Sequence, residues 1–163
     1  MTHTNSNIEE GALAPDFSLP SSDGSEVVLS TLRGKKVVLY FYPKDMTSGC
    51  TTEAHEFSLL AKKFQKAGTL VFGISADSIT RHQKFIEKEG ITFPLLSDED
   101  KKVLTTYGVW VEKSMYGKKY MGIERSTFVI DEKGMIAKIY RKVKPEGHAL
   151  CVLADMNEFA WNV

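Results

Sequence analysis

Cysteine is scarce in this sequence, since only Cys50 and Cys151 occur among its 163 residues. Two cysteines are too few for the disulfide framework of a small secreted domain and too few for a zinc site with four thiolate ligands. The 4 histidines are scattered without a pair at metal-ligand spacing, and the carboxylates follow no calcium-loop or metalloprotease pattern. We therefore expect neither a metal nor another cofactor. A thiol in this sequence would serve a purpose other than a disulfide framework or a zinc site.

Long apolar runs and an excess of charge are also missing. The longest wholly apolar segment, residues 37–42, is far shorter than the roughly 20 residues that a membrane helix needs. The first residues, MTHTNSNIEEG, lack the cationic start and apolar stretch of a secretory signal. Because 21 basic residues balance 21 acidic ones, nothing indicates a protein held on nucleic acid by many phosphate contacts. We expect a cytoplasmic protein whose main partner is neither a membrane nor a nucleic acid.

The length is typical of one domain that buries a core without disulfide or metal support. Residues 1–8 lack apolar periodicity and are predicted to form a mobile tail, and residues 9–163 to form a single domain. Turn residues at 21–24 separate two short extended segments, which predicts an N-terminal β-hairpin. Further strands are predicted at 35–42, 69–76, 93–96, 126–131 and 135–141, and helices at 50–68, 79–89, 100–107 and 148–161. Strands and helices that alternate early, followed by a late hairpin, predict a central mixed β-sheet flanked by helices, an α/β domain with a thioredoxin-like fold.

Cys50 lies where the loop after the predicted central strand leads into a helix. Its sulfur would therefore lie near unpaired backbone N–H groups and the positive end of the helix dipole, both of which favour a thiolate. A lone cysteine is usually a small buried hydrophobe. The strand-to-helix position favours a reactive thiol instead.

The segment around this cysteine resembles a known family. Pro43, Thr47 and Cys50 reproduce the Pro-x-x-x-Thr-x-x-Cys signature of peroxiredoxins, and FYPKDMTSGCTTEA is similar to the bacterioferritin comigratory (Q-type) branch. APDFSLPSSDG, GISADS, FPLLSDED and GIERSTFVID extend the resemblance over residues 9 to 160. It implies a thiol-dependent peroxidase that reduces hydrogen peroxide and organic hydroperoxides through a cysteine sulfenic acid.

The resemblance also implies a role for each site residue. Cys50 would attack the peroxide O–O bond, Thr47 would exchange hydrogen bonds with the peroxide and the thiolate, and Pro43 would fix the loop and shield the sulfur. Arg125 would stabilise the thiolate and polarise the peroxide, and Glu53 would orient this arginine. Without the resemblance, Thr47 would be interpreted as a helix cap or a loop residue that bonds the backbone, Arg125 as a solvated surface residue, and Glu53 as a first-turn glutamate favoured by the dipole.

The sequence departs from the family at the second thiol. Many members of this branch carry a cysteine five residues after the first, where this chain has His55, and none occurs at 80–89 either. Cys151 is the one possible internal partner, and its apolar neighbours predict a buried, inert thiol. We therefore expect a one-cysteine peroxidase, a monomer as is usual in this branch, reduced by thioredoxin, glutaredoxin or glutathione. Ser48 replaces a common proline, which would loosen the loop.

Three alternatives remain open. Cys151 could resolve the sulfenic acid, giving a two-cysteine peroxidase. A thioredoxin-like disulfide reductase would need a second thiol close to Cys50, but Thr51, Thr52 and Glu53 follow it. A non-catalytic thioredoxin-fold binding or holdase module would leave the peroxiredoxin signature unexplained.

Overall fold

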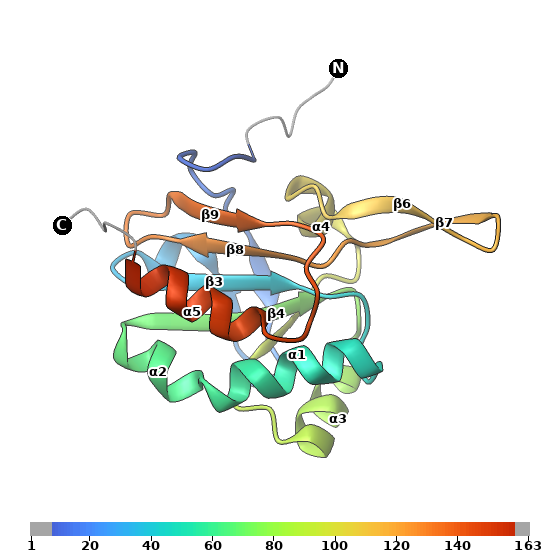
Figure 1. The fold of residues 1–163 in the computed structure, drawn as a ribbon, viewed down its shortest axis with the longest axis horizontal. Helices are drawn as coiled ribbons and strands as arrows, with labels where there is room; N and C mark the ends of the chain where they lie inside the picture. Colours follow the sequence, from blue (N-terminus) through green and yellow to red (C-terminus); the bar gives the residue numbers. More distant parts are fainter. Residues whose placement is uncertain (1–7, 159–163) are drawn as a thin grey trace.

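The computed structural model describes residues 8–158, which form a mixed five-stranded sheet flanked by helices (Figure 1). The strands follow the order β5-β4-β3-β8-β9. Their bounds are Lys36–Phe41 (β3), Thr69–Ser75 (β4), Leu95–Ser97 (β5), Ser126–Ile130 (β8) and Ile136–Tyr140 (β9). β3 pairs in parallel with β4, and β4 with β5, whereas β8 is antiparallel to both β3 and β9. The predicted thioredoxin-like mixed sheet is confirmed.

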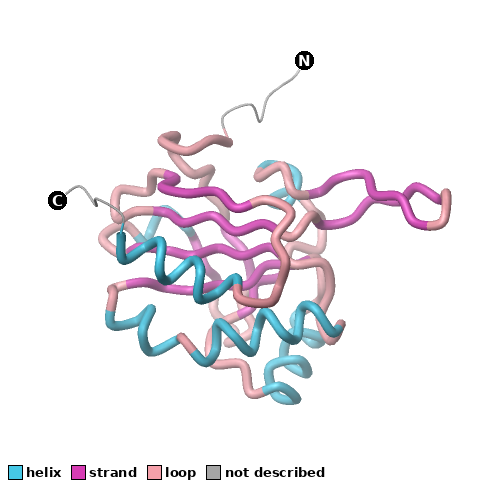
Figure 2. The backbone as a smooth tube through the Cα atoms, viewed as in Figure 1, coloured by secondary structure: helices cyan, strands magenta, loops and turns pink. Residues whose placement is uncertain are grey.

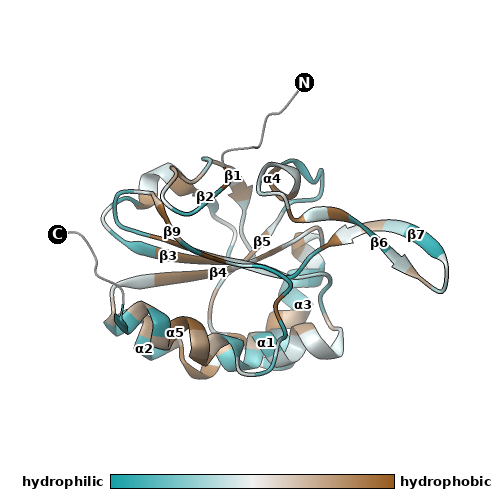
Figure 3. Cartoon of the chain, turned by 45° about the horizontal axis from the view of Figure 1, so that its top comes forward, coloured by the Kyte–Doolittle hydropathy of each residue, from teal (hydrophilic) through white to brown (hydrophobic). Residues whose placement is uncertain are grey.

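Both faces of the sheet are covered, as Figure 3 shows. One face carries the helices α1 (Ser48–Leu59), α2 (Ala61–Lys66), α3 (Ile79–Glu89) and α5 (His148–Glu158). The other carries the predicted N-terminal hairpin of β1 (Ser18–Pro20) and β2 (Glu26–Val28), the 3-10 helix η2 (Leu29–Leu32) and α4 (Lys102–Thr106). Alternate residues of β3 enter two separate apolar clusters, which explains why this strand has no polar positions after Lys36.

The predicted helix at 50–68 is wrong in its continuity and its start. It begins at Ser48 and is interrupted at Leu60, where the Leu60 N–H bonds the carbonyl oxygens of Glu56 and Phe57, before α2 continues. The change in direction lets α2 pack on β4 and buries the ring of Phe64. Cys50 still lies in the first helical turn.

The boundaries of α3 match the prediction because strong local signals fix them. The hydroxyl of Ser78 caps the first turn by accepting a hydrogen bond from the Arg81 N–H. At the other end Gly90 adopts the left-handed conformation (φ 65°) that glycine accommodates best.

A further hairpin, which the sequence pattern did not predict, is formed by β6 (Trp110–Met115) and β7 (Lys118–Ile123) and projects from the body of the protein (Figures 1 and 2). Most of its side chains are exposed or half-buried, so it lacks the apolar alternation of a typical strand pair. Tyr116 and Gly117 both have positive φ at the turn, as a type I′ hairpin requires, but tyrosine is an unusual residue there.

Residues 1–7 and 159–163 lie outside the described residues, and with them the last three predicted residues of the final helix. Ile8, which was assigned to the tail, is half-buried against the core. Within residues 8–158 no helix has the length and apolar character needed to span a membrane.

Candidate active site

Cys50, Glu53 and Arg125 meet at one end of the central sheet. Arg125 immediately precedes β8, and because Phe41 of β3 pairs with Ser126, it lies next to the loop that leads from β3 into α1. Its Nη2 lies 3.5 Å from the sulfur of Cys50, and its Nη1 donates to Glu53 Oε1 at 2.6 Å. One guanidinium therefore contacts both the thiol and the carboxylate.

The start of α1 places the sulfur in a setting suited to an anion. Cys50 is the third helical residue, so the backbone N–H groups of the first turn and the positive end of the dipole lie close to it. Cys50 is only 1% exposed, so bulk water does not screen the attraction between its sulfur and the guanidinium of Arg125. At the preceding residue, Gly49, a Cβ would lie 3.2 Å from Arg125 Nη2 and 3.3 Å from Pro145 Cγ. A glycine there allows the close approach of the guanidinium.

The loop before α1 contains the other two predicted residues. Pro43 is half-buried directly after β3, and Thr47 is exposed at the N-cap position. The Thr47 hydroxyl donates to the carbonyl oxygen of Lys44 (2.8 Å) and makes no side-chain cap to the helix. The Thr47 side chain therefore does not cap α1, but it does bond the backbone of the loop, as the alternative interpretation allowed.

Burial and charge act against each other in this cluster. Burial raises the pKa of Glu53 to about 7 even though Arg125 favours its ionised form. Burial alone would lower the pKa of Arg125, but the attraction of Glu53 and Cys50 outweighs it, so that this pKa is raised. Lys113 of β6 is a second cation near the sulfur; burial and then repulsion from Arg125 lower its pKa, although Glu124 and Cys50 oppose this. Lys113 does not stand out in the sequence, because the hairpin that carries it lacks clear apolar alternation.

The raised pKa of Glu53 predicts a specific pH dependence of stability. Between pH 4.5 and about 7 the unfolded chain releases this proton while the folded protein retains it, so the contribution of Glu53 to the free energy of unfolding falls as pH rises. The fall is on the order of 3 kcal/mol, because each pH unit between the two pKa values contributes about 1.4 kcal/mol. Urea unfolding of wild type and of Glu53→Gln at several pH values measures it.

The quantity to compare is the difference in free energy of unfolding between wild type and Glu53→Gln at each pH. Burial, and then Arg125, lower the pKa of His148 to about 4, which gives stability an opposite slope between about 4 and 6.5. That slope is present in both proteins and cancels in the comparison. Wild type should lose stability relative to Glu53→Gln as pH rises to 7, and a constant difference would contradict the assignment.

The prediction of a buried Cys151 is wrong, because this side chain is exposed. Helical periodicity turns Ala149, Val152 and Met156 inward, and leaves Cys151 beside the exposed Leu150 on the outer side of α5. Its sulfur lies 3.8 Å from Asp155 Oδ2. Slight burial and then Asp155 raise its pKa, which disfavours the thiolate. Both cysteines are free thiols.

Two histidines that sequence reasoning treated alike differ in the structure. His55 is exposed and bonds Glu89 through Nε2 (2.9 Å), as expected of a surface residue. His82 is fully buried and lies 2.7 Å from a buried carboxylate oxygen of Asp45. Ligand-type atoms of Asp45, Asp77 and His82 lie within 4.8 Å of one another, but these residues already exchange hydrogen bonds with each other or with neighbouring groups. Nothing in the sequence distinguished His82 from the other histidines.

The thiol lies in the first turn of a helix of a thioredoxin-like domain, and an arginine just before the neighbouring strand connects it to a carboxylate. These features define the class as cysteine-based redox proteins of the thioredoxin fold. Residues 11–139 match the model of the AhpC/TSA family. Peroxiredoxin Bcp of Bacillus subtilis is 48% identical, with 93% of this chain and 98% of the relative covered. Peroxiredoxin Bcp of Escherichia coli is 44% identical, with 94% of this chain and 98% of the relative covered.

A solved structure of Xanthomonas campestris peroxiredoxin Q superposes with a TM-score of 0.87 at 43% identity, covering 96% of this chain and 99% of that one. The chain belongs to the AhpC/TSA family, among the peroxiredoxins of the Bcp or Q type.

Proposed function

We propose that this protein reduces hydrogen peroxide and organic hydroperoxides with Cys50 as the nucleophile. The single observation that carries the proposal is the arginine bridge, in which Arg125 contacts both the Cys50 sulfur and Glu53. A structure of the X. campestris relative concerns its alkyl peroxide reduction activity, which supports the same chemical class of substrate. Consumption of hydrogen peroxide and of an alkyl hydroperoxide, with dithiothreitol as reductant, tests the proposal, and a protein that consumes neither would end it.

The oxidative half-reaction is a displacement at oxygen. The Cys50 thiolate attacks one oxygen of the hydroperoxide, an S–O bond forms, and the O–O bond breaks. The sulfur gives up two electrons and becomes a sulfenic acid, while the departing alkoxide or hydroxide takes up a proton and leaves as alcohol or water. Arg125 stabilises the sulfur anion first and the departing oxygen afterwards.

The loop residues complete the pocket in this proposal. Because the Thr47 hydroxyl donates to the Lys44 carbonyl oxygen, Thr47 holds the hydroperoxide by accepting a hydrogen bond from its O–H. Pro43 shields the sulfur from water. Glu53 keeps the guanidinium in place through the 2.6 Å bond. Because the reacting atoms must lie roughly 3 to 3.5 Å apart and in line, the positions of these side chains decide the rate.

We propose further that turnover uses one protein cysteine. The Cys50 side chain belongs to the apolar cluster between the sheet and its helices, whereas Cys151 faces away from that cluster. An external thiol then condenses with the sulfenic acid, releasing water, and a second thiol displaces Cys50 as a free thiol, leaving the donor oxidised. Thioredoxin, glutaredoxin and glutathione can each supply these thiols. We place this cycle in a monomer in the reducing cytoplasm.

Intact mass after one equivalent of peroxide separates the two mechanisms. A one-cysteine protein gains one oxygen atom and shows the same product in Cys151→Ser. A rapid loss of two hydrogens in wild type that disappears in Cys151→Ser would instead make Cys151 the resolving thiol.

A further inference from the structure

Asp45, midway along the loop between β3 and α1, is held by contacts at all of its polar groups. Its side chain is 1% exposed. Its Oδ1 accepts a hydrogen bond from the Tyr42 hydroxyl (2.5 Å), and its Oδ2 lies 2.7 Å from His82 Nδ1. Its N–H donates to Asp77 Oδ2 (2.8 Å), and its carbonyl oxygen accepts from Arg81 Nη2 (3.2 Å). We name this group of five residues the Asp45 clamp.

The protons in the clamp can be placed from its partners. His82 Nε2 faces the carbonyl oxygen of Leu96 at 2.9 Å, and a carbonyl only accepts, so Nε2 carries a proton. The 2.7 Å distance between His82 Nδ1 and Asp45 Oδ2 requires a second proton between these atoms. His82 therefore ties the loop to β5 and α3 with both of its nitrogens. Tyr42 and His82 are fully buried, so no water competes for these bonds.

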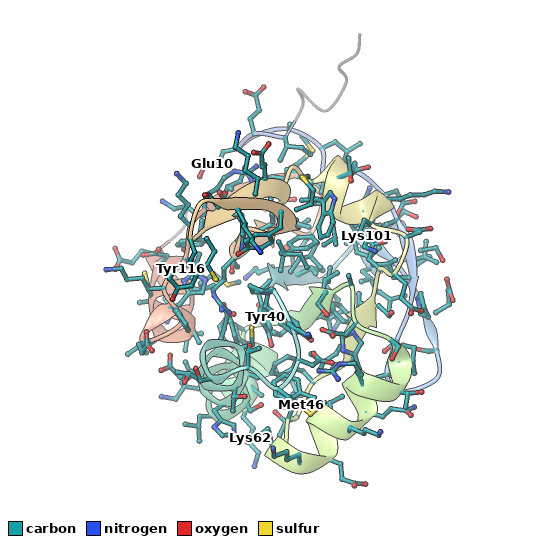
Figure 4. The ribbon with its side chains drawn as sticks, turned by 90° about the vertical axis from the view of Figure 1, so that its right-hand side faces the viewer. Glu10, Tyr40, Met46, Lys62, Lys101 and Tyr116 are labelled. Carbon is teal, nitrogen blue, oxygen red and sulfur yellow. The ribbon has the colours of Figure 1, made fainter. Side chains whose placement is uncertain are left out.

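The clamp determines the path of the backbone toward Thr47. Met46, the next residue after Asp45, has φ 67°, a left-handed conformation that side chains other than glycine adopt only when their surroundings impose it. Met46, which is labelled in Figure 4, is half-buried and packs against the apolar cluster that includes Phe85 of α3. On the other side of Met46 the Thr47 hydroxyl closes the loop on Lys44. Both neighbours of Met46 are therefore held by hydrogen bonds to other parts of the protein or the loop.

We propose that His82 and Asp45 are positioning residues for the peroxide step, which hold the loop so that Pro43 and Thr47 face the Cys50 sulfur. This inference rests on the proposed peroxidase function. Neither residue contacts the reacting atoms in the geometry described above. The contacts of Cys50 with Arg125, and of Arg125 with Glu53, come from α1 and from the start of β8, and do not pass through the clamp. Loss of the clamp should therefore loosen the loop from Pro43 to Thr47 while leaving the sulfur and its arginine in place.

A pair of similar-sized substitutions tests this separation. His82→Asn keeps a donor near Asp45 Oδ2, whereas His82→Leu removes it. In a Cys151→Ser background, where Cys50 is the sole thiol, quenched samples analysed by mass give two rate constants, one for oxidation by hydrogen peroxide and one for alkylation by iodoacetamide. Alkylation requires the Cys50 thiolate, but it does not require the loop residues that orient a hydroperoxide.

We expect His82→Leu to lower the rate constant for peroxide by about 10-fold to 100-fold, as displacement of a reacting group by about 1 Å does, with alkylation unchanged or faster. His82→Asn should stay within about threefold of the parent for both reactions, because the hydrogen bond to the carboxylate persists. Equal peroxide rates in the two variants, or a parallel fall of alkylation in His82→Leu, would overturn the proposal.

Two further variants separate positioning from general loss of stability. Phe64→Leu removes buried volume in α2, away from the clamp, and should leave the ratio of peroxide to alkylation rates unchanged. Should His82→Leu not fold, Tyr42→Phe deletes one oxygen atom and one bond to Asp45, and should lower the same ratio by about threefold or more; an unchanged ratio in Tyr42→Phe would contradict the role of the clamp. A parent protein that does not react with peroxide at all would refute the peroxidase function itself, which these ratios do not address.

Discussion

Cys50→Ser will lower hydroperoxide consumption by at least about 1,000-fold, the scale seen when a catalytic nucleophile is removed. Serine has nearly the same size, but its hydroxyl is neither ionised at neutral pH nor easily oxidised. Arg125 and Glu53 would still meet beside it. Consumption of an alkyl hydroperoxide with excess dithiothreitol measures the effect.

Cys151→Ser is the matched control for this loss. The Cys151 side chain is exposed on the outer side of α5, so its replacement should alter neither folding nor the rate with dithiothreitol. Equal activity in the two single variants would show that the reacting group is neither thiol. Loss of activity in Cys151→Ser alone would place the chemistry on α5.

Arg125→Met should have the second-largest effect, a fall in the rate constant for peroxide on the order of 100-fold to 1,000-fold, typical of the loss of a donor to a developing charge. The guanidinium contacts sulfur and carboxylate with two different nitrogens. A lysine would carry the charge without this planar fork, so Arg125→Lys should recover only part of the rate. Single-turnover oxidation of Cys50 followed by mass provides the measurement.

Arg125→Met also leaves Glu53 buried without its ion-pair partner, which alone can cost about 3 to 5 kcal/mol of stability. The double variant Arg125→Met with Glu53→Gln removes this complication. It should recover stability, as shown by urea unfolding, without recovering the peroxide rate. A double variant that regained both would mean that Arg125 serves the fold and not the reaction.

The parts of the fold that sequence predicted are those fixed by local signals. Residues 37–42 are all apolar because both faces of the sheet at β3 are covered. Ser78 and Gly90 mark the two ends of α3 directly. The break at Leu60 could not be predicted in this way. It depends on how α2 packs back against β4, a tertiary contact that helical periodicity does not reveal.

The candidate site also has features that local sequence predicts and features that depend on tertiary contacts. The position of Cys50 at a helix start could be predicted from its neighbours in the sequence, but its meeting with Arg125 depends on the register of β3 with β8, and only the family resemblance indicated it. Cys151 was misplaced because apolar sequence neighbours do not reveal which side of a helix faces the core. His82 was missed because its partner Asp45 is 37 residues away.

The most direct test is to identify the atom that receives the oxygen. Wild type is treated with one equivalent of hydroperoxide in the presence of a dimedone-type trap, digested, and analysed by peptide mass. The account predicts a single adduct on the peptide that contains Cys50. An adduct confined to Cys151, or peroxide consumed with no sulfenic acid formed on Cys50, would contradict it.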